Sequence, residues 1–196
     1  MNVYDLSSAP ELRQSKLNLG ESPVANAAIK MLDATTFSRV GFRGKGVSAF
    51  LIEQGFVVPS SPNQSVLNDS GILILRLSQT EFWLVDIENS QHGLIQGVEL
   101  ASNKVSDVYR LYCQHSHSCF VLVGDDIPNM FAKVCGVDLS DQSFAVSNIA
   151  QTSVARINSI VVRQDIKGVD TYLMFSDLAS AQSLWDAIAD ACEEFN

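Results

Sequence analysis

The sequence predicts an α+β fold built from two similar halves, each reading ββαββα, with mixed or antiparallel sheets and helices on one face. Apolar segments of strand length alternate with segments whose apolar residues recur at helical spacing. Hydrophobic residues make up 46% of the chain and charged residues 18%, which is enough apolar material for a core. Four positions repeat at one constant interval: Gly44 with Gly124, Val47 with Ile127, Phe50 with Met130, and Leu51 with Phe131.

This pattern predicts three parts of the chain. Residues 1–24 form an N-terminal arm, 25–104 the first half and 105–196 the second half, with the two halves closely packed as one unit. The arm is polar, contains two prolines and lacks sustained periodicity. It is therefore either a mobile tail or a segment that becomes ordered against a partner.

The first half alternates strand and helix signals. Gly55 closes its first short helix, and the apolar run at 72–77 is typical of a strand buried on both faces. Prolines and polar residues predict a loop at 57–68. The expected elements are a strand pair at 27–32 and 37–42, a helix containing Val47, Phe50 and Leu51, a hairpin of strands at 72–77 and 82–87, and a helix at 92–102.

The second half repeats this order. Its first helix opens at Asp126 with Pro128 in the first turn, where the missing N–H costs little, and ends at Gly136. Asp177 is the expected N-cap of the last helix, whose apolar residues recur at helical spacing to Phe195. The expected strands lie at 108–112, 120–123, 154–163 and 171–175.

Charge and composition exclude several classes of function. The formal net charge is −9, from 13 Lys and Arg against 22 Asp and Glu, whereas a nucleic-acid binder must neutralise phosphates. We therefore expect neither nucleic acid nor a membrane surface as a partner. The N-terminus lacks the basic and apolar regions of a secretory signal, and no apolar run approaches the length of a membrane span. Four cysteines are too few for a disulfide framework, so we expect a reducing, cytoplasmic location.

Cys113, His115, His117 and Cys119 form the most conspicuous cluster of candidate ligands. At alternate positions of an extended strand they would be about 6.6 Å apart at each step, too far to share one zinc ion. They could converge only if the chain turned back at 115–117, and the same turn could place the two cysteines side by side as buried thiols. We predict an ordinary hairpin without metal here.

Other candidate motifs have structural explanations of equal or greater weight. Gly44-Lys45-Gly46 before a helix could hold an anion, but a tight turn explains it equally well. Asp125-Asp126 fits helix capping better than catalysis. Trp83 and Trp185 fit a core better than ligand platforms. No nucleophile–base motif, Walker loop or dinucleotide-binding motif is visible, so the residues favour a binding or structural module over an enzyme.

Three stretches carry a resemblance to a known family. Residues 37–51 and 75–85, the latter reading Leu-Arg-Leu-Ser-Gln-Thr-Glu-Phe-Trp-Leu-Val, resemble the glycine-cleavage T-protein superfamily. Residues 124–139, Phe144 and the segment Ala-Gln-Thr-Ser-Val-Ala at 150–155 resemble the gamma subunits of sarcosine oxidase. Residues 180–195 are similar to the closing helix of that family.

The resemblance implies a non-catalytic gamma subunit of a heterotetrameric, tetrahydrofolate-linked sarcosine oxidase. The implied fold is that of the T-protein folate-binding domain, and the implied role is assembly of the flavin-containing subunits. The implied partners are the larger alpha and beta subunits and the small delta subunit. The flavins, NAD and folate would belong to the larger subunits and zinc to the smallest, which leaves this chain without a cofactor or an active site of its own.

Departures from the enzyme pattern agree with this reading. Catalytic T-proteins carry a carboxylate in the strand that here reads Ile72-Leu-Ile-Leu75-Arg76, and a glutamate where Leu173 stands. A pterin needs such acceptors for its N–H donors, and burying those donors unpaired costs a few kcal/mol. The alternative is a stand-alone folate-binding or aminomethyltransferase-like protein.

Overall fold

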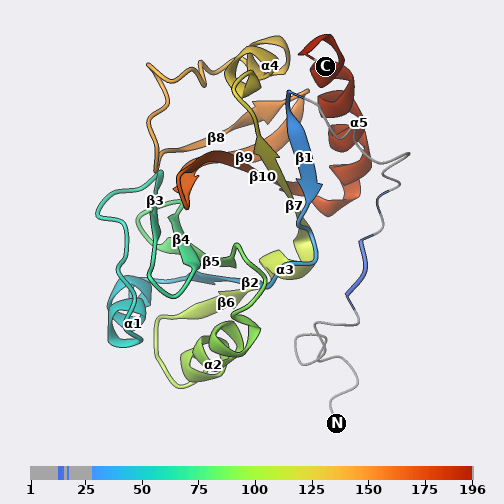
Figure 1. Ribbon diagram of the computed structural model, residues 1–196. Helices are drawn as coiled ribbons and strands as arrows, with labels where there is room; N and C mark the ends of the chain where they lie inside the picture. Colours follow the sequence, from blue (N-terminus) through green and yellow to red (C-terminus); the bar gives the residue numbers. More distant parts are fainter. Residues whose placement is uncertain (1–12, 16, 18–27, 196) are drawn as a thin grey trace. The chain divides into compact units, whose positions relative to one another are not determined.

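The computed structural model describes residues 13–15, 17 and 28–195, which divide into two compact units (Figure 1). Unit 1 contains residues 13–15 and 36–115, and unit 2 contains 17, 28–35 and 116–195. The elements follow in chain order: β1 (Lys30–Asp33), β2 (Arg39–Arg43), α1 (Val47–Glu53), β3 (Gln64–Leu67), β4 (Ile72–Arg76), β5 (Glu81–Asp86), α2 (His92–Ser102), β6 (Tyr109–Leu111), α3 (Cys113–Ser116), β7 (His117–Val123), α4 (Ile127–Val134), β8 (Ile149–Val154), β9 (Ile157–Ile166), β10 (Val169–Asp177), η3 (Leu178–Ser180), α5 (Ala181–Cys192) and η4 (Glu193–Phe195).

Unit 1 is a five-stranded sheet in the order β3-β4-β5-β2-β6, and every neighbouring pair is antiparallel. Because strand side chains alternate between faces, every second residue points toward α1 and α2. These residues and the two helices form one apolar core: Val40, Phe42, Ile72, Ile74, Phe82 and Leu84 from the strands, and Val47, Phe50, Leu51, Ile95 and Val98 from the helices. Phe42 and Phe50 pack edge to face, with ring centroids 5.7 Å apart.

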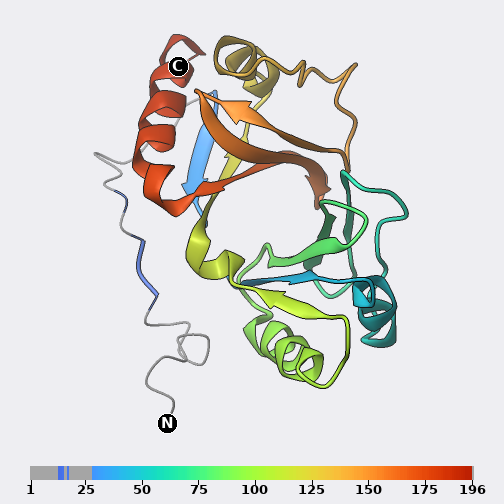
Figure 2. The same cartoon turned by 180° about the vertical axis from the view of Figure 1, so that it is seen from behind.

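Unit 2 is built in the same way. Its antiparallel sheet has the order β1-β7-β10-β9-β8, and α4 and α5 lie side by side against one face (Figure 2). Phe120, Met174 and Tyr172 point toward these helices and pack with their apolar residues, among them Trp185. The Trp185 ring meets Phe120 edge to face at 5.2 Å. Trp185 is thus a core residue, as the sequence predicts.

Each sheet is completed by a strand from the other half of the repeat. β1 precedes β2 in the chain but pairs with β7 of unit 2, and β6 precedes β7 but pairs with β2 of unit 1. The two sheet orders correspond strand for strand when β3, β4, β5, β2 and β6 are matched with β8, β9, β10, β7 and β1. The repeat is therefore a tandem duplication whose leading strands are exchanged.

Gly44 and Gly124 occupy equivalent turns, and each turn packs against the backbone just before an exchanged strand, β6 or β1. Their φ angles are +144° and +150°, a region that side-chain-bearing residues rarely adopt. A Cβ on Gly44 would lie 1.9 Å from the carbonyl oxygen of Asp107, just before β6, and one on Gly124 would lie 2.2 Å from that of Ala28, just before β1. Glycine is required because the incoming backbone occupies the space of a side chain.

The α+β class with helices on one face of antiparallel sheets is confirmed, but the strand count and one pairing differ from the prediction. The strands expected at 27–32 and 37–42 both form, as β1 and β2, but do not pair with each other. After β1, the Ala34 N–H donates to the Cys119 carbonyl at 2.8 Å and the chain then leaves for unit 1. The expected halves at 25–104 and 105–196 thus differ from the two units by one exchanged strand each.

Each half also contains one strand more than expected: the first reads ββαβββα, and the second has the same order with the short helix α3 added between its first two strands. The additional strands are β3, inside the segment predicted as a loop at 57–68, and β8, in the polar stretch before 154. Both lie at an edge of their sheet and occupy equivalent positions in the repeat. The predicted N-cap Asp177 accepts a hydrogen bond from the Ala179 N–H at 2.7 Å, but it caps the short η3 turn that precedes α5.

Candidate functional site

The face of the unit 2 sheet that points away from α4 and α5 is organised in cross-strand rows. One row is apolar across all five strands, and the strand register places its members side by side: Ile149, Val162, Leu173, Val121 and Leu32. Leu173, where the resemblance places a glutamate in catalytic T-proteins, is thus in the middle of an apolar row. A carboxylate there would lose hydration without gaining a partner from its cross-strand neighbours.

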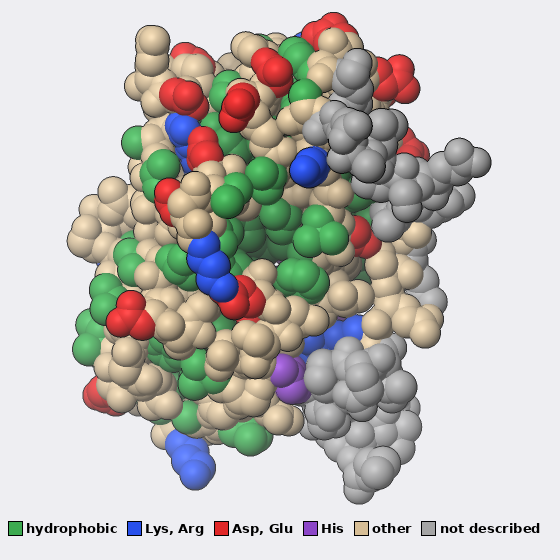
Figure 3. Space-filling view, in the orientation of Figure 1, with side chains coloured by type: hydrophobic (Ala, Val, Ile, Leu, Met, Phe, Trp, Pro, Cys, Tyr) green, Lys and Arg blue, Asp and Glu red, His purple; other side chains and the backbone are tan. Residues whose placement is uncertain are grey.

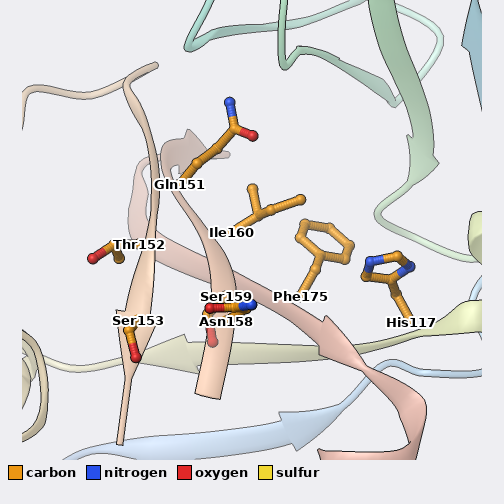
Figure 4. Close-up of a pocket in the computed structure, with 8 residues that line it drawn as sticks. All are labelled: His117, Gln151, Thr152, Ser153, Asn158, Ser159, Ile160 and Phe175. Atoms are coloured by element: carbon orange, nitrogen blue, oxygen red, sulfur yellow. The ribbon is translucent and has the colours of Figure 1, made fainter. Parts of the chain in front are cut away.

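The adjoining rows of the same face are more polar and line a cavity of about 440 Å³. Gln151, Ile160 and Phe175 form one row, and Ser153 and Asn158 belong to the next. Figure 4 shows Gln151, Ile160 and Phe175 projecting to the same side as His117, whereas Thr152 points the other way. The eight lining residues supply amides, hydroxyls and one imidazole over an apolar floor, and none of them is a carboxylate or a cysteine.

This cavity is a candidate ligand site in unit 2, but its chemistry is that of binding. The Nδ1 atom of His117 lies 2.8 Å from the hydroxyl of its neighbour Ser116, so this imidazole has a hydrogen-bond partner beside it. Neutral amides and hydroxyls orient a polar ligand but do not supply the strong base or the nucleophile that bond cleavage needs. The sequence did not predict this cavity, because His117 and the β8–β9 hairpin are brought together only by the sheet.

The strand expected to hold the other T-protein carboxylate is likewise apolar. β4 places Ile72 and Ile74 in the core of unit 1, and Leu73 and Leu75 are fully buried on the opposite face. Next to Leu75 lies Trp83, whose indole N–H donates to Glu81 at 3.1 Å. Trp83 is buried, as predicted, but on the sheet face away from α1 and α2.

A serine–histidine contact in unit 1 resembles a nucleophile–base pair. The Ser38 hydroxyl lies 3.0 Å from Nδ1 of His92, although the two residues are far apart in the sequence. The same hydroxyl accepts a hydrogen bond from the guanidinium of Arg13 at 3.0 Å. Ser38 is 0% exposed, so a substrate cannot reach it. We interpret the contact as structural, joining β2, α2 and the described part of the N-terminal arm.

Only residues 13–15 and 17 of the predicted arm at 1–24 are described; the remainder lies outside the described residues. Arg13 donates to Ser38 and to the Gln114 side chain, the latter at 3.4 Å. Leu17 packs against the core of unit 2. Both residues therefore contact the chain's own units, and whether the arm binds a partner stays a prediction.

The segment from Cys113 to Cys119 is not the hairpin that the sequence predicts. α3 joins β6 to β7, and those strands belong to different sheets, so they cannot form a hairpin. Cys113 and Cys119 are both buried, the first in unit 1 and the second in unit 2. Among residues 13–15, 17 and 28–195, no group of three or more His, Cys, Asp or Glu side chains is arranged to hold a metal ion. The absence of zinc from the protein stays a prediction.

The two remaining motifs have local explanations in the structure. The N–H groups of Gly44, Gly46 and Val47 donate to the carbonyls of Thr80, Asp107 and Gly44, so the Gly-Lys-Gly turn does not offer them to an anion. Asp126 stands at the N-cap position of α4, but its carboxylate accepts from the Asn129 amide at 3.0 Å and not from a backbone N–H.

We expect Cys135 to be the first thiol to react with a disulfide reagent near neutral pH. Burial raises the pKa of Cys113 to about 12 and that of Cys192 to about 11, and only the thiolate reacts. Cys119 is also buried, whereas Cys135 is partly exposed. Colorimetric titration should give one fast equivalent that Cys135→Ser removes, with the others released only on unfolding. A fast equivalent that survives in Cys135→Ser would contradict the burial of the other three thiols.

The fold is similar to those of two solved structures. One is a chain of the heterotetrameric sarcosine oxidase from Corynebacterium sp. U-96 in complex with pyrrole 2-carboxylate, with a TM-score of 0.71 and 21% identity over 89% of this chain and 88% of that chain. The other is the glycine cleavage system aminomethyltransferase T from Bartonella henselae, with a TM-score of 0.57 and 15% identity over 83% of this chain. The present chain spans only 45% of that enzyme's length.

These likenesses define the class of protein: an α+β chain with the T-protein-like fold that the sequence predicts. No family model matches the sequence, and no curated protein matches it. At such identities the likeness shows the fold alone, and the gamma-subunit assignment stays a prediction. Within the part of the chain that the structure describes, none of the helices is both long and apolar enough to cross a membrane.

Proposed function

We propose that this chain is a non-catalytic subunit of a tetrahydrofolate-linked, heterotetrameric sarcosine oxidase, in the position of the gamma subunit. The observation that carries the proposal is the reciprocal coverage of the Corynebacterium chain, 89% of this chain and 88% of that one. The aminomethyltransferase, by contrast, is more than twice as long as the part that this chain matches. This reciprocal match favours one chain of an oxidase assembly over the longer aminomethyltransferase.

The local chemistry supports an assembly role. Leu173 lies in an apolar row, β4 is apolar on both faces, and the cavity beside Phe175 has a neutral lining. Following the family resemblance, we assign the flavins, NAD and folate to the larger alpha and beta subunits and zinc to the small delta subunit. None of the four cysteines forms a disulfide in the described structure, and a reducing, cytoplasmic location remains part of the proposal.

The proposal is tested by expressing the chain alone and together with flavin-containing sarcosine oxidase subunits. Alone, it should be colourless, fail to oxidise sarcosine and give no calorimetric heat with tetrahydrofolate. Expressed together, it should co-elute with the yellow subunits on size exclusion, and omitting it should lower the yield of active complex.

Two outcomes would overturn the proposal. Folate binding by the isolated chain at about micromolar concentration would favour the alternative, a stand-alone folate-binding or aminomethyltransferase-like protein. Separate elution of the chain and the yellow subunits would exclude the role in assembly.

A further inference from the structure

The edge strand β8 of the unit 2 sheet has a strand neighbour on one side only, β9. Its six residues read Ile-Ala-Gln-Thr-Ser-Val and include neither a charged residue nor a proline. Gln151 and Ser153 are exposed, and Ala150 and Thr152 are partly exposed. The described part of the chain therefore leaves the middle of this strand accessible to another molecule.

The other edge strands of the two described sheets have features by which proteins protect a sheet edge from further pairing, namely short length, charge or a covering segment. β1 has four residues with a charge at each end, Lys30 and Asp33, and β6 has three residues, one of them Arg110. β3 has four residues, and beside its end the Asn68 side chain bonds the N–H and the carbonyl of Val57 at 2.7 and 3.1 Å. β8 is thus the longest of these edges and the least protected.

Backbone groups of β8 point away from the sheet. In an antiparallel pair, the residues whose backbone groups bond the neighbouring strand alternate with residues whose groups point outward. On the side away from β9, Cys135 pairs with Val154, and the Ala155 N–H donates to the Val134 carbonyl at 2.8 Å. The alternation places the Ser153 N–H on this outer side as well, and no described residue accepts a hydrogen bond from it.

The cavity of about 440 Å³ adjoins this edge. Gln151 and Ser153 line it, and a strand paired with β8 would place every second side chain on the same face of the sheet. None of the lining residues is Asp, Glu, Lys or Arg, and Ile160 and Phe175 supply an apolar floor (Figure 4). A charged side chain would lose hydration there without gaining an opposite charge, so the lining favours an uncharged one.

We propose that an extended, uncharged segment of a partner subunit pairs with β8 as a sixth strand of the unit 2 sheet and places one side chain in this cavity. The inference rests on the proposed function, since it supposes a partner protein. Strand addition draws its affinity from main-chain hydrogen bonds and its selectivity from pockets for alternate side chains. Figure 3 shows Lys and Arg side chains on one face only as separate patches, with Asp and Glu side chains between them, so no large surface of one charge selects a partner on that face.

The proposal is tested by removing the outward N–H. Ser153→Pro lacks this donor but keeps the bonds between β8 and β9, and proline is tolerated in an edge strand where its nitrogen faces outward. We expect capture of co-expressed flavin-containing sarcosine oxidase subunits to fall by about tenfold or more. Ser153→Ala is the matched control, because it loses the hydroxyl and keeps the N–H. It should capture the partner as the unaltered chain does and melt at nearly the same temperature as Ser153→Pro.

A second variant does not depend on proline. Gln151→Lys places a charge on the edge strand beside the neutral cavity and should also lower capture by about tenfold or more. Ser183→Lys is its control, because it adds the same charge at an exposed position of α5. Hydrogen exchange then reports the pairing directly: in the complex the Ser153 N–H should exchange at least about tenfold more slowly than in the isolated chain.

The outcomes separate this inference from the proposed function. If Ser153→Pro and Gln151→Lys capture the partner as well as their controls do, or if the Ser153 N–H exchanges equally fast in the complex, the strand pairing is wrong while the proposed function stands. If the unaltered chain captures no partner, the proposed function falls and this inference falls with it. A homodimer of the isolated chain that Ser153→Pro dissociates would overturn the partner in favour of a second copy.

Discussion

Gly44→Ala and Gly124→Ala should each destabilise the protein by about 3 kcal/mol or more, among the largest effects of a single methyl group in this fold. In Gly124→Ala the new Cβ would lie 2.2 Å from the Ala28 carbonyl oxygen and 3.0 Å from the Ile29 Cα. Both contacts are with backbone, so no side chain can move aside to relieve them. The φ angle of +150° adds conformational strain to the clash. The exchanged strand β1 would have to shift away from β7.

The measurement is a denaturant titration of each variant beside Gly97→Ala. Gly97 is in the middle of the exposed side of α2, and a Cβ there would meet no atom within 4 Å. Alanine is the better helix former, so that control should gain up to about 1 kcal/mol. If Gly124→Ala unfolds within about 0.5 kcal/mol of the unaltered protein, the close approach of β1 to this turn is wrong.

The internal repeat could be predicted from the sequence, because the glycine and the first helix of each half are local signals. Gly44 and Gly124 do occupy equivalent turns, and α1 and α4 begin at Val47 and Ile127 as the spacing indicates. Helix α2 likewise runs over the predicted residues, from His92 to Ser102. Each of these signals comes from a few consecutive residues, which is why the sequence suffices.

The two strands that the sequence did not predict, β3 and β8, are edge strands, which explains why they were not predicted. β3 reads Gln-Ser-Val-Leu and β8 reads Ile-Ala-Gln-Thr-Ser-Val, so neither has the continuous apolar run of a strand buried on both faces. The exchange of β1 and β6 was missed for a different reason. Consecutive strands usually pair with each other, so 27–32 and 37–42 were expected to form a hairpin. Neither segment contains a local sequence signal for the distant strand with which it pairs.

The same distinction between local and long-range signals applies to the candidate site. The lack of a carboxylate at Leu173 and in β4 is visible in the sequence, since it concerns residue types at single positions. The cavity beside His117 and the contact between Ser38 and His92 depend on residues far apart in the chain. Only the tertiary fold brings those side chains together.

Arg163→Met should cost about 3 kcal/mol and is the largest side-chain effect that we expect in unit 2. Arg163 is 8% exposed, and its guanidinium donates to both carboxylate oxygens of Asp170 at 2.6–3.2 Å and to the Phe144 carbonyl at 2.7 Å. It also pairs with Asp141 and lies over the Tyr172 ring. The hydrogen bonds that Arg163 donates to the Asp170 carboxylate raise the pKa of Arg163, so the charged form is favoured here. Methionine would leave the Phe144 carbonyl beside the core without its donor.

The repeat supplies the matched control, Arg76→Met. Arg76 pairs with Phe82 across β4 and β5 and lies over its ring, as Arg163 pairs with Tyr172 across β9 and β10. Arg76 donates to the carbonyls of Pro59 and Ser60 and to the Gln79 side chain, at 3.0, 2.7 and 3.2 Å. These acceptors are uncharged, and hydrogen bonds between a charged and a neutral group at a partly exposed position should cost less to lose, about 1–2 kcal/mol.

Each unit contains one tryptophan, so fluorescence can report the two losses separately. In a Trp83→Phe background, the remaining Trp185 lies in the core of unit 2 and reports the unfolding of Arg163→Met; in a Trp185→Phe background, the remaining Trp83 of unit 1 reports the unfolding of Arg76→Met. Arg163→Met should shift the unit 2 transition to lower denaturant by more than Arg76→Met shifts the unit 1 transition. Arg163→Lys should fall between Arg163→Met and the unaltered residue, because lysine keeps the charge but loses the two-pronged contact with Asp170. Equal shifts for Arg163→Met and Arg76→Met would mean that the carboxylates add nothing at this site, and that both arginines act only by holding the loop that leads into the edge strand of their sheet.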